Sequence, residues 1–144
     1  MIKVLVAEDA RQVRETLVAL LGLEDDIEVA AALPSGDQVV PAALEHRPDV
    51  ALLDIGLPGT DGITAAAELA TRLPGCRVLI LTGMTAPAAL SAALRAGVSG
   101  YLLKDDSAEH LIGAVRAVAR GDRVFDDRLA VPASDREQGP PQLR

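Results

Sequence analysis

The sequence has almost no aromatic residues and only one cysteine. Aromatic residues make up 1% of its 144 residues, although hydrophobic residues make up 49%. A core built from Ala, Val, Leu and Ile fits close packing of helices on a sheet, and it leaves few rings to stack on bases or flat cofactors. The lone Cys76 excludes an internal disulfide and fits a reducing cytoplasm. We interpret this cysteine as a small buried apolar residue rather than a reactive thiol.

Positive charge and long apolar runs are also scarce. The formal net charge is -7, and phosphate contacts need clustered Lys and Arg, so we expect no direct nucleic-acid binding by this chain. No apolar run approaches the roughly 20 residues of a membrane span, and no signal peptide precedes the first predicted strand. These features predict a cytoplasmic protein of one domain without membrane contact.

Apolar runs alternate with helical stretches five times along the chain, which is typical of a parallel α/β sheet. Each run is short, rich in Val, Ile, Leu or Ala, and nearly continuous in its apolar character. Such strands are covered by helices on both faces of the sheet. We predict strands near residues 2–7, 27–33, 49–54, 77–82 and 99–103.

Helical patterns separate and follow these strands. We predict helices near residues 10–21, 35–47, 62–73, 85–97 and 107–120. Ser35 and Gln38 match a capping box at the start of the second. Gly22, Gly97 and Gly121 lie at three of the predicted ends, where glycine commonly adopts the left-handed conformation. The chain then becomes polar and contains a Pro-Pro pair, so we divide it into a domain over 1–121 and a linker or disordered tail over 122–144.

Three acidic residues stand where strand patterns end. Glu8 and Asp9 close the first predicted strand, and Asp54 closes the third. Because the carboxyl ends of parallel strands share one edge of the sheet, these carboxylates should converge. Oxygen ligands suit Mg²⁺ or Mn²⁺, and like charges this close resist ionising together unless a cation neutralises them. The sequence therefore predicts a site for a hard divalent cation.

Thr82 and Lys104 stand at the ends of the fourth and fifth predicted strands. A hydroxyl and an ammonium beside three carboxylates make the parts of a phosphoryl-accepting site. Any single acid at a strand end has an ordinary alternative as a turn or cap residue, and Asp9 alone could merely start the first helix. Turn chemistry does not require all five residues together in this order.

These residues lie in motifs that resemble the receiver domain of two-component response regulators. The motifs are AED at 7–9, LLDIGLPGTDG at 52–62, LTG at 81–83 and YLLKD at 101–105, and the resemblance covers residues 1 to about 125. The segments VLVAED, GVSGYLLKD and ARGDRVFDDRLA are most similar to the NarL/FixJ subfamily. Its members usually carry a C-terminal helix-turn-helix DNA-binding domain, which we do not expect in this chain. The resemblance implies a flavodoxin-like, doubly wound sheet of five parallel strands in the order 2-1-3-4-5, with five helices.

The resemblance also implies a role for each site residue. Asp54 would accept a phosphoryl group from a sensor histidine kinase, and positioning and charge neutralisation would dominate the chemistry. Glu8, Asp9 and Asp54 would bind Mg²⁺, or Mn²⁺, together with the backbone carbonyl of Gly56. Lys104 would pair with a carboxylate at rest and with a phosphoryl oxygen after transfer.

Two further residues match the family's switch. Thr82 would donate its hydroxyl to the phosphoryl group, and Tyr101 would turn inward when Thr82 moves. The structural alternative for Thr82 is a β-branched residue at a strand end, and for Tyr101 a half-buried strand tyrosine. Many receivers have a proline after the lysine, often through a cis bond, whereas Asp105 follows Lys104 here and leaves that loop's geometry open. Asp105 and Asp106 could instead cap the last helix.

The predicted function is a phosphorylation-controlled signalling switch that regulates transcription through a DNA-binding domain absent from this chain. Its only catalysis would be its own phosphoryl uptake and loss. An alternative is a Mg²⁺-dependent phosphotransferase or phosphatase with Asp54 as nucleophile. Haloacid-dehalogenase-like enzymes place an acid/base Asp two positions further on, where this chain has Gly56. A flavin- or nucleotide-binding domain would need a Gly-rich phosphate loop, which the sequence lacks.

We also expect a weak homodimer that phosphorylation strengthens. Members of the subfamily commonly pair through the first and last helices or through the fourth and fifth helices. Apolar residues of the last helix cover a wider arc than one sheet contact requires, which would leave at least Ile112 for a partner: Leu111, Ile112, Val115 and Val118. His46 and His110 have no nearby partner in sequence, and we expect both to face solvent.

Overall fold

The computed structural model describes residues 1–83 and 87–126. The expected start of the fourth helix near Thr85 and the predicted tail after residue 126 lie outside these ranges. In chain order the elements are β1 (Ile2–Ala7), α1 (Arg11–Gly22), β2 (Ile27–Leu33), the 3₁₀ helix η1 (Gly36–Gln38), α2 (Val39–His46), β3 (Val50–Asp54), α3 (Gly62–Arg72), β4 (Arg77–Thr82), α4 (Pro87–Arg95), β5 (Gly100–Leu103), α5 (Ala108–Ala119) and β6 (Val124–Phe125).

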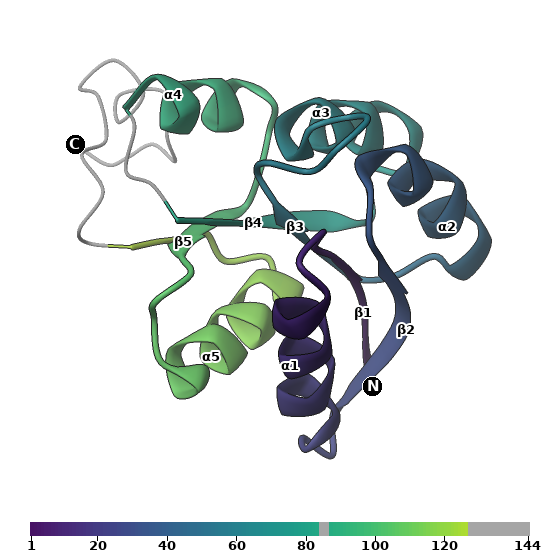
Figure 1. Ribbon diagram of the computed structural model, residues 1–144, viewed down its shortest axis with the longest axis vertical. Helices are drawn as coiled ribbons and strands as arrows, with labels where there is room; N and C mark the ends of the chain where they lie inside the picture. The colour runs from purple at the N-terminus through teal and green to yellow at the C-terminus, as the bar shows by residue number, and fades with distance from the viewer. Residues whose placement is uncertain (84–86, 127–144) are drawn as a thin grey trace.

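The strands form one parallel sheet in the order β2-β1-β3-β4-β5-β6. Helices α1 and α5 cover one face of the sheet, and α2, α3 and α4 cover the other (Figure 1). The predicted doubly wound α/β fold, with the order 2-1-3-4-5 for the first five strands and five helices, is confirmed.

The sixth strand is a correction to the five-stranded prediction. Val124 pairs with Gly100 and Phe125 pairs with Tyr101, so β6 extends the sheet in parallel beyond β5. We had assigned both residues to the segment that follows the domain. A strand of two residues is too short to produce a recognisable apolar pattern, and its pairing depends on where the chain returns after α5.

The core lies in two layers, one on each face of the sheet. Along β1, Val4 and Val6 pack on the side of α1 and α5, while Leu5 and Ala7 pack on the side of α2, α3 and α4. All residues of β3 are buried, as its continuous apolar pattern predicts. Burying one Leu or Val side chain completely contributes roughly 1.5–3 kcal/mol. Small aliphatic residues therefore dominate the core, and Tyr101 adds one fully buried aromatic ring.

The apolar arc of α5 is used within the chain itself. Leu111, Ile112, Val115 and Val118 are all buried, with Ile112 only 9% exposed. The expectation that Ile112 is left for a partner is therefore wrong. The sixth strand accounts for this difference, because Val124 joins the apolar layer beneath α5 and widens the surface that the helix covers.

Two of the three predicted glycine stops adopt the left-handed conformation. Gly97 has φ 89° and Gly121 has φ 101°. The prediction for Gly22 is wrong, because this residue lies inside α1 and has no positive φ. The N–H of Leu23, in right-handed conformation, closes that end instead by donating to the carbonyl of Leu20.

None of the helices within residues 1–83 and 87–126 combines the length and the apolar character that a membrane span requires.

Candidate functional site

The structure brings Glu8, Asp9 and Asp54 together at the carboxyl edge of the sheet. One carboxylate oxygen from each lies within 4.8 Å of the other two. Glu8 and Asp54 are buried, whereas Asp9 is exposed at the mouth of the cluster. Two buried carboxylates beside a third concentrate negative charge, which favours a bound cation. We call these three residues the acid pocket.

Lys104 supplies a positive charge to the acid pocket. Its Nζ lies 3.0 Å from Glu8 Oε1 and 3.1 Å from Asp54 Oδ1. Burial alone would lower the pKa of Lys104, but hydrogen bonds and attraction to Glu8 and Asp54 prevail and raise it. Its backbone N–H donates to the carbonyl of Thr82 at 2.8 Å, which fixes the end of β5 beside the end of β4. The ammonium therefore bridges the two buried carboxylates.

Glu8 is held in place by hydrogen bonds on several sides. Its N–H donates to the carbonyl of Leu33 on β2 at 2.9 Å, and its Oε2 accepts from the N–H of Ala10 at 3.0 Å. Arg14 in α1 donates to the Glu8 carbonyl at 2.8 Å. These contacts fix the side chain between the end of β1 and the start of α1.

The loop after Asp54 is pinned through its backbone. The N–H of Ile55 donates to the carbonyl of Leu81 at 3.0 Å, and the N–H of Gly62 donates to the carbonyl of Ile55 at 3.1 Å. A Cβ on Gly62 would overlap the carbonyl of Asp54, so the chain can approach this closely only at a glycine. Gly56 lies in the turn directly after β3.

Sequence reasoning missed the contact between this loop and η1. The N–H of Gly36 donates to the carbonyl of Pro58 at 3.0 Å, and the Thr60 hydroxyl donates to Asp37 Oδ1 at 2.8 Å. A Cβ on Gly36 would overlap the Thr60 carbonyl. We had interpreted Ser35 and Gln38 as a capping box at the start of the second predicted helix. The Ser35 side chain makes no capping hydrogen bond.

Thr82 and Tyr101 lie on neighbouring strands behind the acid pocket. Thr82 ends β4 and is buried, and the Tyr101 ring is fully buried, not half-buried as the structural alternative required. Burial raises the pKa of Tyr101, and an interaction with the Thr82 hydroxyl opposes that rise. The two predicted switch residues are thus close enough to influence each other.

The segment between β5 and α5 differs from the expected capping. Ser107, not Asp105 or Asp106, caps α5, because its Oγ accepts from the N–H of His110 at 3.1 Å. His110 Nδ1 lies 3.2 Å from Asp106 Oδ2, so the expectation that this histidine has no partner is wrong. The Lys104–Asp105 peptide bond is trans, as are the other peptide bonds over 1–83 and 87–126.

The two remaining sequence candidates lie away from the acid pocket. His46 is half-buried at the end of α2, and its carbonyl accepts from the Lys3 ammonium at 2.8 Å. Cys76 is buried, as predicted, and burial raises the pKa of its thiol to about 11. Neither residue takes part in the site.

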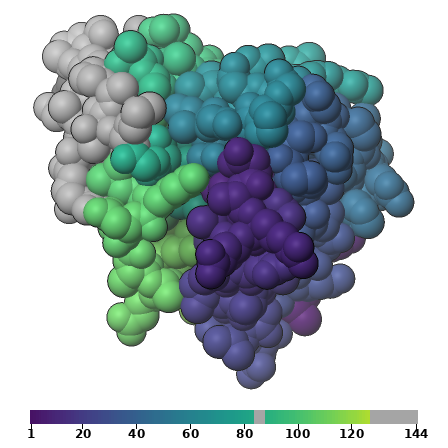
Figure 2. Space-filling view, in the orientation of Figure 1, coloured from purple at the N-terminus to yellow at the C-terminus, as the bar shows by residue number. Residues whose placement is uncertain are grey.

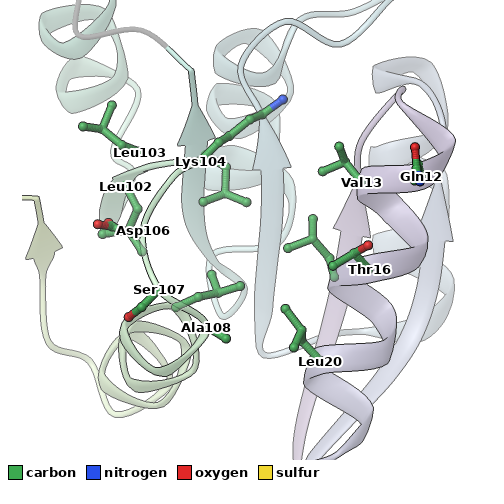
Figure 3. A pocket seen from close by; sticks show the side chains of 13 residues that line it. Gln12, Val13, Thr16, Leu20, Leu102, Leu103, Lys104, Asp106, Ser107 and Ala108 are labelled. Atoms are coloured by element: carbon green, nitrogen blue, oxygen red, sulfur yellow. The ribbon is translucent and has the colours of Figure 1, made fainter.

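An apolar groove runs between α1 and α5 and reaches Lys104 at one end. It has a volume of about 450 Å³, and Val13, Thr16 and Leu20 line it from α1 (Figure 3). Ala108 and Leu111 line it from α5. The two helices lie beside each other on one face of the molecule (Figure 2). We call this feature the α1–α5 groove.

Comparisons with known proteins identify the family. The protein-family model of the response regulator receiver domain matches residues 4–116 of this chain. This chain belongs to the response regulator receiver family. It is 39% identical over 145 residues to the transcriptional regulatory protein DesR of Bacillus subtilis, covering 96% of this chain and 72% of DesR.

Other relatives of this receiver are transcriptional regulators and receiver structures. It is 38% identical over 130 residues to the DNA-binding transcriptional activator DevR/DosR of Mycobacterium tuberculosis, and the match covers 90% of this chain and 60% of that protein. The structure of the receiver domain of the putative response regulator NarL from the same organism aligns with a TM-score of 0.81 at 34% identity, over 83% of this chain and 97% of that one. The relatives carry names of regulatory proteins, not of classical enzymes. The chain spans only about three-fifths of several of them.

Proposed function

We propose that this receiver accepts a phosphoryl group on Asp54 from a sensor histidine kinase in the cytoplasm. The observation that carries the proposal is the position of Asp54, which lies buried at the end of β3 beside two further carboxylates and within 3.1 Å of the Lys104 ammonium. Attack of a carboxylate oxygen on phosphorus forms an acyl phosphate, while the bond to the donor breaks and its electron pair leaves with the donor. Lys104 is placed to neutralise charge on the transferred group.

Mg²⁺ fits the acid pocket through the chemistry of its donors. The pocket offers carboxylate oxygens from Glu8, Asp9 and Asp54, which a small hard cation prefers, and Gly56 follows closely enough in the chain to add its carbonyl. A bound Mg²⁺ would neutralise the charge that develops on the phosphoryl oxygens. Asp9→Ala removes the exposed ligand without opening the core, so Mg²⁺ affinity should fall by about tenfold or more, or ~1.4 kcal/mol. A fluorescence or NMR titration with Mg²⁺ measures this loss.

Thr82 and Tyr101 are placed to report the state of Asp54. The Thr82 hydroxyl would donate to the phosphoryl group, which would end its interaction with Tyr101. The phosphoryl group would then favour a second arrangement of β4 and β5 through differential contacts. In the longer relatives named as transcriptional regulators, such a change would reach a DNA-binding domain, and we propose the same output for the protein that contains this receiver.

A weak homodimer strengthened by phosphorylation is the second part of the proposal. The α1–α5 groove supports it, because Val13 is 38% exposed beside an apolar lining and Lys104 connects the groove to the acid pocket. A two-fold dimer uses the same patch on both copies. Sedimentation with and without beryllofluoride tests this part, with Val13→Glu as the variant that should stay monomeric. An identical monomer in both wild-type samples across the micromolar range would contradict dimerisation and leave the acceptor chemistry untouched.

The acceptor chemistry itself is tested with acetyl phosphate and Mg²⁺. Intact-mass spectrometry should find one phosphoryl group on the wild type and none on Asp54→Ala. The matched control is Asp61→Ala, which alters a carboxylate that caps α3 in the same loop. Equal labelling of wild type and Asp54→Ala would overturn the proposed function. A turnover phosphatase, the alternative function, would instead release phosphate from the donor continuously.

A further inference from the structure

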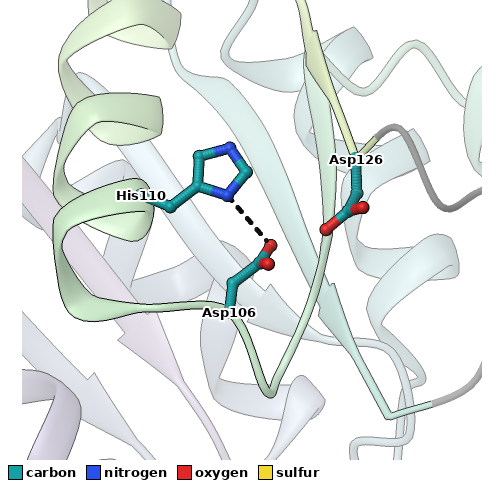
Figure 4. A group of neighbouring side chains, drawn as sticks. All are labelled: Asp106, His110 and Asp126. Carbon is teal, nitrogen blue, oxygen red and sulfur yellow. Dashed lines mark ion pairs between the residues drawn. The ribbon is translucent and has the colours of Figure 1, made fainter.

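A second cluster of metal-ligating side chains lies beyond Lys104, outside the acid pocket. Asp106 belongs to the segment between β5 and α5, His110 to the first turn of α5, and Asp126 follows β6 directly (Figure 4). One ligand atom from each lies within 4.8 Å of the other two. We propose that Asp106, His110 and Asp126 form a second metal site, for a transition metal of the Zn²⁺ type. We call these three residues the outer cluster.

The spacing of the ligand atoms fits a shared ion. His110 Nδ1 and Asp106 Oδ2 are 3.2 Å apart. Two ligands of a tetrahedral zinc ion, each ~2.0–2.1 Å from the metal, are separated by about 3.3–3.4 Å. The Asp126 carboxylate points toward this pair from β6 (Figure 4). Zn²⁺ could therefore bind His110 Nδ1 and Asp106 Oδ2 with little movement of either.

Two side chains of the outer cluster are largely buried, and the third is exposed to solvent. Asp126 is 5% exposed, and the side chain of Asp106 is 14% exposed. The His110 side chain is 47% exposed and forms the open side. A metal site needs such an entry path together with ligands that are already close to their bound positions.

The backbone holds each ligand independently of a metal. The N–H of Asp106 donates to the carbonyl of Leu103 at 3.2 Å, and Ser107 Oγ accepts from the N–H of His110. The N–H of Asp126 donates to the carbonyl of Tyr101 at 3.1 Å. These hydrogen bonds fix the start of α5 and the end of β6 at a distance that the three side chains span. Such backbone support holds the three ligands near a metal-binding geometry before a metal binds.

The donor set distinguishes this site from the acid pocket. One imidazole nitrogen and two carboxylate oxygens suit Zn²⁺ and its transition-metal neighbours, whereas three carboxylates suit Mg²⁺. A bound metal would join the residue that follows β6 to the segment carrying Lys104. The outer cluster would thereby fasten the chain where it leaves the sheet. This inference does not depend on the phosphorylation of Asp54.

Calorimetric titration with Zn²⁺, in a buffer that contains a large excess of Mg²⁺, tests the proposal. The wild type should bind one Zn²⁺ in the outer cluster, and His110→Ala should bind it at least tenfold more weakly. The matched control is His46→Ala, which removes the other histidine and should stay within about twofold of wild type. Circular dichroism verifies that each variant is folded.

A second pair of variants separates the two clusters. Asp126→Asn should also weaken Zn²⁺ binding at least tenfold, while Asp9→Ala should retain it. Replacing Zn²⁺ with Co²⁺ should give visible absorption bands in the wild type that are lost in His110→Ala. Absence of Zn²⁺ binding by the wild type would overturn the proposal. Equal affinities of wild type and His110→Ala, or a loss in Asp9→Ala, would also overturn it.

Discussion

The acid pocket and the outer cluster have the same number of metal-ligating side chains, but different structural elements carry them. Each brings one ligand atom from each of three metal-ligating side chains within 4.8 Å of the other two. The acid pocket is built at the ends of two adjacent strands, β1 and β3, and Lys104 from β5 offsets its charge. The outer cluster joins a loop, a helix and a short edge strand, and a histidine takes the place of the third acid. Adjacent parallel strands place side chains predictably, whereas a returning chain does not.

The largest expected difference between the two clusters is in phosphoryl uptake. Lys104→Ala removes the charge that offsets Glu8 and Asp54, and loss of one such stabilising group costs about 10²–10³ in rate. The rate of labelling by acetyl phosphate with Mg²⁺ should fall by that factor. His110→Ala removes the imidazole from the outer cluster, and its labelling rate should stay within about twofold of wild type. Equal losses in the two variants would erase the functional distinction between the clusters.

The second prediction concerns how strongly stability depends on close backbone packing beside the acid pocket. Gly36→Ala would push a methyl group into the Thr60 carbonyl of the loop beside the acid pocket, and such overpacking costs about 2–3 kcal/mol. Urea unfolding measures the change in the free energy of unfolding. Gly22→Ala is the matched control, because a Cβ there meets no atom within 4 Å. Alanine in that helix should instead add about 0.5–1 kcal/mol. Equal midpoints for the two variants would contradict this account of the loop.

The smallest expected effect is in the stability of the metal-free outer cluster. The His110 side chain is 47% exposed, and exposed ion pairs contribute about 0–1 kcal/mol. In a chelating buffer, the free energy of unfolding of His110→Ala should therefore lie within about 1 kcal/mol of wild type. A loss well above this value would indicate that His110 is a structural residue, and would blur the contrast with the buried acid pocket.

The sequence predicted well those features that follow from regular elements. Continuous apolar runs gave the strands, and their parallel arrangement predicted that Glu8, Asp9 and Asp54 converge with Lys104. Features that depend on contacts distant in sequence were missed. The pairing of Val124 with Gly100 is set by how the chain leaves α5, so β6 was not predicted. Val124 of this strand packs against the apolar layer that contains Ile112, and Asp126 follows the strand directly. The outer cluster was therefore missed together with β6.

Two expectations from local sequence rules also failed. Gly22 was expected to end a helix by its conformational freedom, but Leu23 completes that end with right-handed backbone. Ser35 and Gln38 were expected to form a capping box, but the Ser35 side chain makes no capping hydrogen bond, and Gly36 and Asp37 contact the loop after Asp54. Sequence spacing alone does not reveal that η1 approaches this loop.

The most direct test of the central claim is to locate the phosphoryl group. After reaction with acetyl phosphate and Mg²⁺, borohydride reduces an aspartyl phosphate to homoserine, and peptide mass spectrometry identifies the altered residue. We predict conversion at Asp54 and at no other carboxylate of the acid pocket or the outer cluster. Conversion at Asp9, Asp106 or Asp126, or an unchanged Asp54 in a labelled protein, would contradict the account.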